Sequence, residues 1–493
     1  MRIALGLVLS WLLAACATAP VTPSGSLVIT DVMIASPERD APYGPTSVRI
    51  IDGRIAEIGG PFRAGEGATM LDGAGRYLSP GLIDSHVHLN EIPGLPFGAE
   101  ETHPDLAAAW TAQAPRSFLY HGFTTLIDLF SSGERVAAWN ARTDAPHVHF
   151  CGGAPVMDGY PTNFMPAPQR YEIISTFVIN STQTAPEGID PAAHTPDAVV
   201  ERIAQDGAIC VKTHFESGFG RVRNLPTPSA EILRALRDAA HARGMKLLLH
   251  ANSQQAHAAG VAGDVDLFVH GMWTWNDRRA RELSAEITAL LDAEIEADIA
   301  VQPTIQVLYG EGDLLDPNFL SRPGLADVYP PPLLAWYATE DGQWFRNEML
   351  QDEEVRELVS AGRWDEPLAG PIARVNAVTR YGASHGQQLL FGSDTPSGPT
   401  YANPPGLNGR WEMDRWLATG IEPTRIFRAA TIENAAFFGL EDVGVVAIGK
   451  QADLLLLRDN PFESVTAFDA IDLVIVDGEP IARETLSARA RAD

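Results

Sequence analysis

The sequence predicts an α/β protein in which a (β/α)8 TIM-like barrel is joined to a small β-sandwich built from both chain ends. From Gly81 onward, short apolar runs alternate with helix-like stretches, which is typical of a parallel sheet with crossover helices. The segments before and after this region have the pattern of β-strands instead. The 493 residues are also enough for a barrel of ~250 residues and a second domain.

The composition is that of a globular protein, and its charge argues against one class of partner. Hydrophobic residues make up 45% of the chain and charged residues 20%, which excludes a mostly disordered protein. The 36 basic and 63 acidic residues give a formal net charge of −27. Nucleic acid is therefore not an expected partner, because phosphate binding requires clustered Lys and Arg. The three cysteines are too few for a disulfide framework.

Residues 1–15 have the features of a signal peptide. Arg2 precedes an apolar run at 3–15 that is shorter than the ~20 residues needed to span a bilayer. The run ends in Leu13-Ala14-Ala15-Cys16, which resembles a bacterial lipobox, and a tether rich in Thr, Pro, Ser and Gly covers 16–25. The resemblance implies lipid on Cys16 and a protein anchored to the bacterial cell envelope, facing the periplasm or the exterior. The alternative is an ordinary signal peptide and a soluble secreted or periplasmic protein.

Residues 26–79 and 443–493 are expected to form the composite β-sandwich. In the first segment, Asp52-Gly53 separates two runs rich in β-branched residues, which is the pattern of a hairpin with a type I′ turn. In the second, aliphatic runs alternate with turn signals such as Asp477-Gly478. Because both chain ends have the β pattern, we expect them to meet in one domain.

The barrel is expected to cover residues 80–442. Helix starts are predicted at Thr195-Pro196 and Thr227-Pro228, where a hydroxyl can cap a helix with proline in its first turn. Two insertions, 153–194 and 306–386, are too long for plain loops, and the aromatic residues of the second predict a structured lid over the barrel mouth. The eight expected strands are 82–88, 124–130, 147–151, 208–214, 246–250, 267–270, 300–303 and 389–394.

Two histidines end the first barrel strand. Side chains two apart on a strand share a face, so His86 and His88 can converge on one metal ion. Barrel active sites are built at the C-terminal ends of the strands, which is where this pair lies. A second pair, His147 and His149, lies at the start of its strand and is therefore interpreted as structural.

Four other strands end in Lys212, His250, His270 and Asp394. Lys212 is the most informative, because a lysine within an apolar strand is seldom buried without a partner, and its ammonium would repel a nearby divalent cation. Both difficulties disappear if the amine has taken up CO2 to give a carbamate whose oxygens bridge two ions. The alternative is a salt bridge from Lys212 to an acidic residue.

The set His86-x-His88, Lys212, His250, His270 and Asp394 resembles the amidohydrolase superfamily with a two-metal centre. The spacings of 38 residues from Lys212 to His250 and 20 from His250 to His270 are similar to those of its prolidase-like, imidazolonepropionase-related branch. Three C-terminal stretches are similar to the tail of that family: Ala430-Thr431-Ile432-Glu433-Asn434, Gly449-Lys450-Gln451-Ala452-Asp453 and Asp459-Asn460-Pro461.

The resemblance implies two divalent metal ions, with zinc the default for imidazole and carboxylate ligands. Metal-activated hydroxide would attack the substrate carbonyl, and Asp394 would pass its proton to the leaving amine. Asp84, on the same strand face as His86, is expected to support the ligands from behind. By the resemblance, one ion is held by His86, His88 and Asp394 and the other by His250 and His270, with carboxylated Lys212 and a hydroxide between them.

The implied activity is hydrolysis of an amide or peptide bond in a small substrate, either a dipeptide or an N-acyl amino acid. Two alternatives stay open: hydrolysis of a cyclic amide or lactone by the same centre, and a catalytically inactive envelope lipoprotein that binds ligands. Arg221 and Arg223 could bind a substrate carboxylate. His214, two residues after Lys212, is a further candidate substrate contact, with a place in the core as its alternative.

Overall fold

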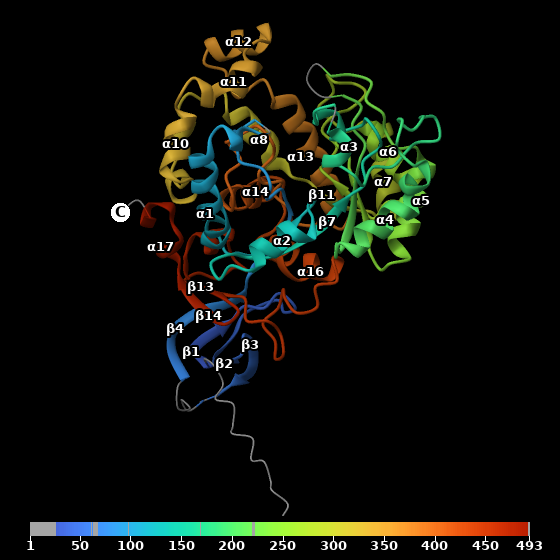
Figure 1. The fold of residues 1–493 in the computed structure, drawn as a ribbon. Helices are drawn as coiled ribbons and strands as arrows, with labels where there is room; N and C mark the ends of the chain where they lie inside the picture. Colours follow the sequence, from blue (N-terminus) through green and yellow to red (C-terminus); the bar gives the residue numbers. More distant parts are fainter. Residues whose placement is uncertain are drawn as a thin grey trace, which may run out of the picture.

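The computed structural model describes residues 26–60, 62, 68–96, 98–167, 169–218 and 222–491. Within these ranges the chain forms two sheets of seven strands each. Figure 1 shows strands from the start and the end of the chain, in blue and red, lying together beside a larger part in which helices surround a sheet. The expected signal peptide, lipobox and tether lie outside the described residues. No helix of the described part is long and apolar enough to cross a membrane.

The barrel sheet is entirely parallel, because each strand returns to the same end of the barrel through a helical connection. Neighbouring strands follow the order of the chain. The strands are β5 (Leu82–Val87), β6 (Phe123–Asp128), β7 (His147–Gly153), β8 (Cys210–His214), β9 (Lys246–His250), β10 (Leu267–Val269) and β11 (Ala300–Gln302).

The segment 389–394 closes this sheet into a barrel. It is not a regular strand, but it is hydrogen bonded on both sides: Leu390 N donates to Val301 O (2.9 Å), and Ser85 N donates to Phe391 O (3.2 Å). The predicted fold class, a (β/α)8 TIM-like barrel with a β domain made from both chain ends, is confirmed, and its eighth strand is irregular.

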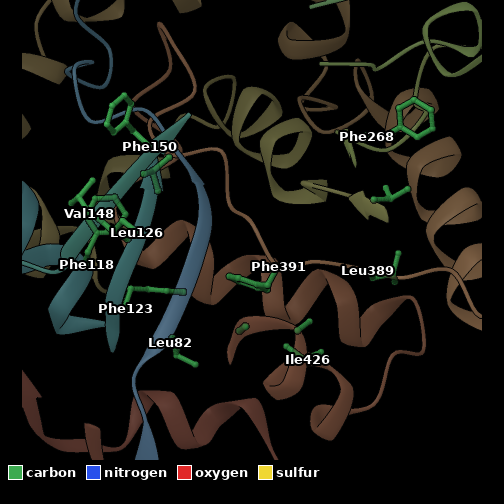
Figure 2. Packing of buried hydrophobic residues seen from close by; sticks show 14 of the residues in the cluster. Leu82, Phe118, Phe123, Leu126, Val148, Phe150, Phe268, Leu389, Phe391 and Ile426 are labelled. Atoms are coloured by element: carbon green, nitrogen blue, oxygen red, sulfur yellow. The ribbon is translucent and has the colours of Figure 1, made fainter. Parts of the chain in front are cut away.

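Helices cover the outside of the barrel (Figure 1). Figure 2 shows apolar side chains of the strands and of the closing segment, such as Phe123 and Phe391, packing among helix residues such as Phe118 and Ile426. The helices around the barrel are α1 (Pro104–Tyr120), α2 (Gly133–Asn140), α3 (Arg170–Ile173), α4 (Pro196–Gln205), α5 (Ala230–His241), α6 (Gln254–Gly263), α7 (Ala285–Glu296), α8 (Ile305–Asp313), α13 (Ala369–Ser384), α14 (Leu407–Ala418), α15 (Pro423–Arg428) and α16 (Asn434–Phe437).

One of the two predicted helix starts is correct. Thr195 caps α4, because its hydroxyl accepts a hydrogen bond from Ala198 N. The start predicted at Thr227-Pro228 is wrong by two residues. Helix α5 begins at Ala230, and the cap is Ser229, whose hydroxyl accepts from Ile232 N.

The second sheet is formed by both chain ends. Its central strand, β4, pairs in parallel with β1 and antiparallel with β12, which joins the N-terminal strands to the C-terminal ones. The sheet curls, so that Ala452 N donates to Gly53 O at 2.8 Å and one apolar core fills the space inside. In order across the sheet, the strands are β14 (Glu479–Ala482), β13 (Ile471–Val476), β12 (Leu454–Leu457), β4 (Ala68–Pro80), β1 (Ser26–Ile34), β2 (Tyr43–Ile51) and β3 (Arg54–Gly59).

The insertion 306–386 is helical, and its aromatic side chains serve packing. Tyr329, Leu333 and Tyr337 are fully buried against α1, and the Tyr337 hydroxyl donates to Pro93 O at 2.6 Å. The aromatics expected to form a lid are buried or half-buried, so they belong to a packed core, and closure of the insertion over the barrel mouth stays a prediction. Its elements after α8 are α9 (Leu325–Val328), α10 (Pro331–Tyr337), α11 (Trp344–Met349), α12 (Glu353–Ser360) and α13.

A disulfide bond joins Cys151 on β7 to Cys210 on β8. The two residues are direct partners in the parallel ladder and are fully buried. The sequence contained too few cysteines for a framework, but these two form a single cross-link between strands. Closing a chain segment of 59 residues stabilises the folded state by about 4 kcal/mol in the chain-entropy account.

Candidate metal centre

The six expected ligands lie at one end of the barrel, each within two residues of the end of its strand or of the closing segment. All are buried except His88, whose side chain is 19% exposed. His86 belongs to β5 and His88 follows it, Lys212 belongs to β8, His250 ends β9, His270 follows β10, and Asp394 ends the closing segment.

His86, His88 and Asp394 form a compact group of donor atoms. The Nε2 atoms of the two histidines are 3.3 Å apart, and they lie 2.9 Å and 3.0 Å from Oδ1 of Asp394. Ligand atoms that surround a zinc ion tetrahedrally, with bonds of ~2.0–2.1 Å, are roughly 3.3 Å from one another. The donor atoms of this group therefore fit one ion.

His250 and His270 form a second group beside the first. Nδ1 of His250 lies 3.1 Å from Nε2 of His270. The two groups are adjacent, because donor atoms of His86, His270 and Asp394 all lie within 4.8 Å of one another. The residues present therefore fit a pair of neighbouring cations bound by imidazole and carboxylate.

Lys212 is buried near these ligands without a counter-ion. Its side chain is 2% exposed, and within the described residues no carboxylate lies at ion-pair distance from its Nζ. Burial lowers the pKa of its amine to about 7, with Asp394 acting in the opposite direction. The alternative of a salt bridge is therefore not supported.

Burial also sets the protonation of the other ligands. It lowers the pKa of His86 to about 3 and that of His270 well below its ordinary value, so both imidazoles are neutral at pH 7. Burial alone would raise the pKa of Asp394. The hydrogen bonds of His86 and His88, together with the positive charge that His86 acquires only at low pH, outweigh burial and hold the pKa of Asp394 well below its usual range. The site thus combines neutral nitrogen donors at His86 and His270 with an ionised carboxylate, whereas at His88 the hydrogen bond and charge of Asp394 outweigh burial and raise the pKa.

Three residues at this end of the barrel have a left-handed backbone: His270 (φ 97°), Thr304 (φ 45°) and Asp394 (φ 55°). A positive φ is uncommon outside glycine, and for a β-branched residue such as Thr304 it is strained. Backbone strain of this kind clusters at functional sites, where it holds side chains in place. His270 directly follows β10, Thr304 lies two residues after β11, and Asp394 ends the closing segment, so each lies where the chain turns away from the barrel.

The sequence profile of the amidohydrolase family matches residues 77–266 and 374–481, which is more than half of the chain. The chain belongs to the amidohydrolase family. The resemblance predicted from the ligand motifs is thereby confirmed, and members of this family are metal-dependent.

Individual relatives of this amidohydrolase differ in their named activities. An adenine deaminase of Chelativorans sp. (strain BNC1) is 28% identical over 181 residues, which are 34% of this chain and 29% of that protein. A D-hydantoinase of Rhizobium radiobacter is 34% identical over 102 residues, 20% of each chain. The match thus spans less than a third of either curated relative. The crystal structure of a Xaa-Pro dipeptidase with bound methionine in its active site has the same fold, with a TM-score of 0.63, 20% identity, and 93% of this chain and 100% of the other covered.

Two residues of the amidohydrolase that the sequence analysis missed lie beside candidate ligand histidines. Thr304 Oγ1 lies 2.7 Å from Nδ1 of His270. Glu216 Oε2 accepts a hydrogen bond from the Asn252 amide at 2.9 Å and lies 3.8 Å from Nε2 of His250, so of these two residues only Thr304 is at hydrogen-bond distance from a histidine ring. Such partners fix the ring and its tautomer so that the opposite nitrogen faces the ion. The signal that could have marked them is their position, two residues after β11 and β8.

Replacing Thr304 by valine, which has nearly the same shape, should weaken metal binding by about 10–100-fold, because His270 loses the partner of its Nδ1. The measurement is a titration of the apo-amidohydrolase with zinc against a competing chelator. Thr419→Val is the matched control, since the Thr419 hydroxyl is also buried but donates to Trp416 O in α14 and its turn, away from the ligands. Equal zinc affinity in the wild type and both variants would show that Thr304 does not support metal binding.

Asp84 lies behind the ligands of the amidohydrolase and contacts backbone rather than imidazole. Its Oδ1 accepts hydrogen bonds from Ser393 N (2.9 Å) and His86 N (3.2 Å), and its Oδ2 accepts from the Ser393 hydroxyl. Burial raises the pKa of this carboxyl group to about 7. Asp84 therefore ties the first strand to the closing segment through the main chain of His86 and of Ser393, the residue before Asp394.

The residues expected to contact substrate lie in different surroundings. His214 is buried, and its ring centroid is 5.6 Å from that of His250 and 5.4 Å from that of Tyr160, a residue of the insertion 153–194 that the sequence analysis did not single out. Arg223 is exposed, with Nη1 donating to Val222 O. Arg221 lies outside the described residues.

Proposed function

We propose that the protein is a metal-dependent hydrolase that cleaves the amide or peptide bond of a small substrate, a dipeptide or an N-acyl amino acid. The observation that carries the proposal is the convergence of five donor residues from four barrel segments into two adjacent groups, beside a buried lysine that has no carboxylate at ion-pair distance within the described residues. A protein that only bound ligands would have no need of this set, so catalysis is favoured over an inactive envelope lipoprotein.

In this proposal Lys212 carries a carbamate. Burial lowers the pKa of its amine to about 7, so a large fraction of the amine is neutral near that pH and able to attack the carbon of CO2. The new N–C bond releases one proton and leaves a carboxylate, which converts a buried cation into an anion. Two dications held by mostly neutral histidines need such an anion between them.

The remaining chemistry is divided between the ions and Asp394. When bound, two divalent ions activate a water molecule near neutral pH and polarise the substrate carbonyl. The ionised Asp394 carboxylate accepts the proton of that water and donates it to the departing amine. Tyr160 stays protonated, because burial raises its pKa, and its ring lies 5.1 Å from that of His250. We assign Tyr160 and His214 to one wall of the substrate site.

The names of the relatives support two substrate classes. The likeness to the Xaa-Pro dipeptidase covers 93% of this chain and supports a dipeptide as the substrate, although an identity of 20% shows the fold alone. The D-hydantoinase favours the second candidate, hydrolysis of a cyclic amide by the same centre. The bond that is cleaved joins a nitrogen to a carbonyl carbon in both substrate classes, so the same metal centre serves either reaction.

The test is a screen of zinc-loaded protein against dipeptides, N-acyl amino acids, cyclic amides and lactones, with the Asp394→Asn variant as the background. We expect amine release from linear amides that the variant does not catalyse. Ring opening of cyclic amides without cleavage of linear ones would establish the second candidate. If zinc binds but no compound is turned over above the background, the proposal of catalysis fails.

We further propose that the protein is attached to the bacterial cell envelope through lipid on Cys16. The disulfide between Cys151 and Cys210 supports this location, because such bonds persist in oxidising compartments. Cys16→Ser should release the protein from the membrane fraction or block its maturation, with Cys210→Ser as a control that keeps the anchor. Unchanged fractionation of Cys16→Ser and no acyl label on the wild type would contradict the anchor.

A further inference from the structure

A second group of metal-binding side chains lies at the opposite end of the barrel from the metal centre. His147 is the first residue of β7, Asp453 directly precedes β12, and Asp477 lies in the turn between β13 and β14. The group therefore sits where the barrel meets the terminal sheet. Its position is fixed by the main chain, since Asp453 O accepts a hydrogen bond from Gly81 N at 2.8 Å, at the entry to the first barrel strand.

The donor atoms of this group have the spacing of a tetrahedral metal site. Nε2 of His147 lies 3.5 Å from Oδ2 of Asp453 and 3.3 Å from Oδ1 of Asp477. All three donor atoms lie within 4.8 Å of one another. Ligand atoms bound to zinc at ~2.0–2.1 Å are roughly 3.3 Å apart. Two of the three separations therefore match, without any movement of the backbone.

The Asp453 carboxylate supplies an independent reason to expect a cation. The side chain is 2% exposed, and its Oδ2, the atom that faces His147, is buried without a hydrogen-bond partner. Within the described residues no Lys or Arg pairs with it. Leaving a buried carboxylate oxygen unpaired is costly, and burial accordingly raises the pKa of Asp453 to about 6. A bound dication would offset that cost.

Gln451 can complete the set of ligands. Its Nε2 lies 2.8 Å from Nε2 of His147 and 2.9 Å from Oδ1 of Asp477. Rotating the amide group by half a turn exchanges its nitrogen and oxygen and places the carbonyl oxygen at the same point. Four protein donors are then available: one imidazole nitrogen, two carboxylate oxygens and one amide oxygen.

We propose that His147, Asp453 and Asp477 form a third divalent-cation site, which fastens the barrel to the terminal sheet. An imidazole with carboxylates is a donor set for zinc and its transition-metal neighbours, whereas calcium and magnesium prefer oxygen ligands alone. The histidine interpreted as structural from its position in the sequence is thus assigned a ligand role. The site is structural, because it lies at the end of the barrel away from the reacting groups.

The test is the zinc content of purified full-length protein after equilibration with zinc and removal of the excess, measured by mass spectrometry of the metal. We expect three zinc ions per chain in the wild type and two in His147→Ala, with turnover unchanged. His149→Ala is the matched control: it lies two residues along the same strand, is half-buried and belongs to neither group, so it should keep three. Zinc should also raise Tm further in the wild type than in His147→Ala.

Equal zinc content in the wild type and His147→Ala would overturn the proposal and leave an ion pair between His147 and the two carboxylates. If His147→Ala does not fold, Asp477→Asn answers the same question. Asp477 is 58% exposed and has a φ of 50°, a backbone conformation that asparagine accepts. A content of two in Asp477→Asn supports the site, and a content of three, with three in the wild type, refutes the role of Asp477.

Discussion

Lys212→Ala is expected to lower zinc occupancy at both positions of the metal centre and to reduce kcat/KM by several orders of magnitude. Without the carbamate, two dications a few Å apart repel each other strongly in a buried site. Lys212→Arg should fail in the same way, because a guanidinium stays protonated and does not take up CO2. The measurement is zinc content together with kcat/KM for the wild type and both variants.

Chemical rescue separates the carbamate from a packing role. Acetate, propionate or bicarbonate should restore part of the activity of Lys212→Ala by occupying the space between the ions, whereas none of them can replace a lysine needed only for packing. Lys246→Ala is the matched control, since Lys246 begins the adjacent strand β9 but its side chain is 44% exposed. Two tightly held ions and near-normal turnover in Lys212→Ala would remove the carbamate from the mechanism.

Asp394→Asn is expected to have the second largest effect, a loss of at least about 10³-fold in kcat/KM, because the variant lacks both an anionic ligand and the proton acceptor. Asparagine accepts the left-handed backbone of this position, where φ is 55°. The fold should therefore survive, and the loss can be attributed to the charge. The exposed Asp459→Asn is the control for removal of a carboxylate elsewhere.

The dependence of kcat/KM on pH should be measured for both the wild type and Asp394→Asn. In the wild type, kcat/KM should rise with pH through about 7, because the Lys212 amine must lose its proton before it can react with CO2. The residual activity of Asp394→Asn should keep this rise at a much lower level. A variant with wild-type turnover and two bound ions would show that neither the charge nor the proton acceptor at residue 394 is needed.

The sequence predicted the barrel and the ligand set because both follow from short-range patterns. His86 and His88 are two apart on a strand, and the other ligands end apolar runs, so position alone placed them at one end of the barrel. Thr304 and Glu216 had no such pattern, since they lie on connections and act through contacts with His270 and His250.

Contacts between residues far apart in the chain could not be predicted from the sequence. The partners in the disulfide are 59 residues apart, and His147 meets Asp453 across the two domains. Strand β4 was not recognised as one strand, because Gly73-Ala74-Gly75 interrupts its apolar pattern. The aromatic residues of 306–386 suggested a lid, but aromatic residues in a sequence can belong either to a mobile lid or to a packed hydrophobic core.

The irregular closing segment makes opening of the barrel and metal occupancy interdependent. The segment 389–394 is attached to its neighbouring strands by few backbone hydrogen bonds, one of which runs from Asp394 N to His86 O at 2.8 Å. An ion held by the side chains of His86 and Asp394 would span this same seam. Local opening there requires release of the ion, so amide hydrogen–deuterium exchange at Ser85 and Asp394 should be slow in the metal-loaded protein and fast after chelation. Strand β1 of the terminal sheet carries none of the proposed ligands and should exchange alike in both.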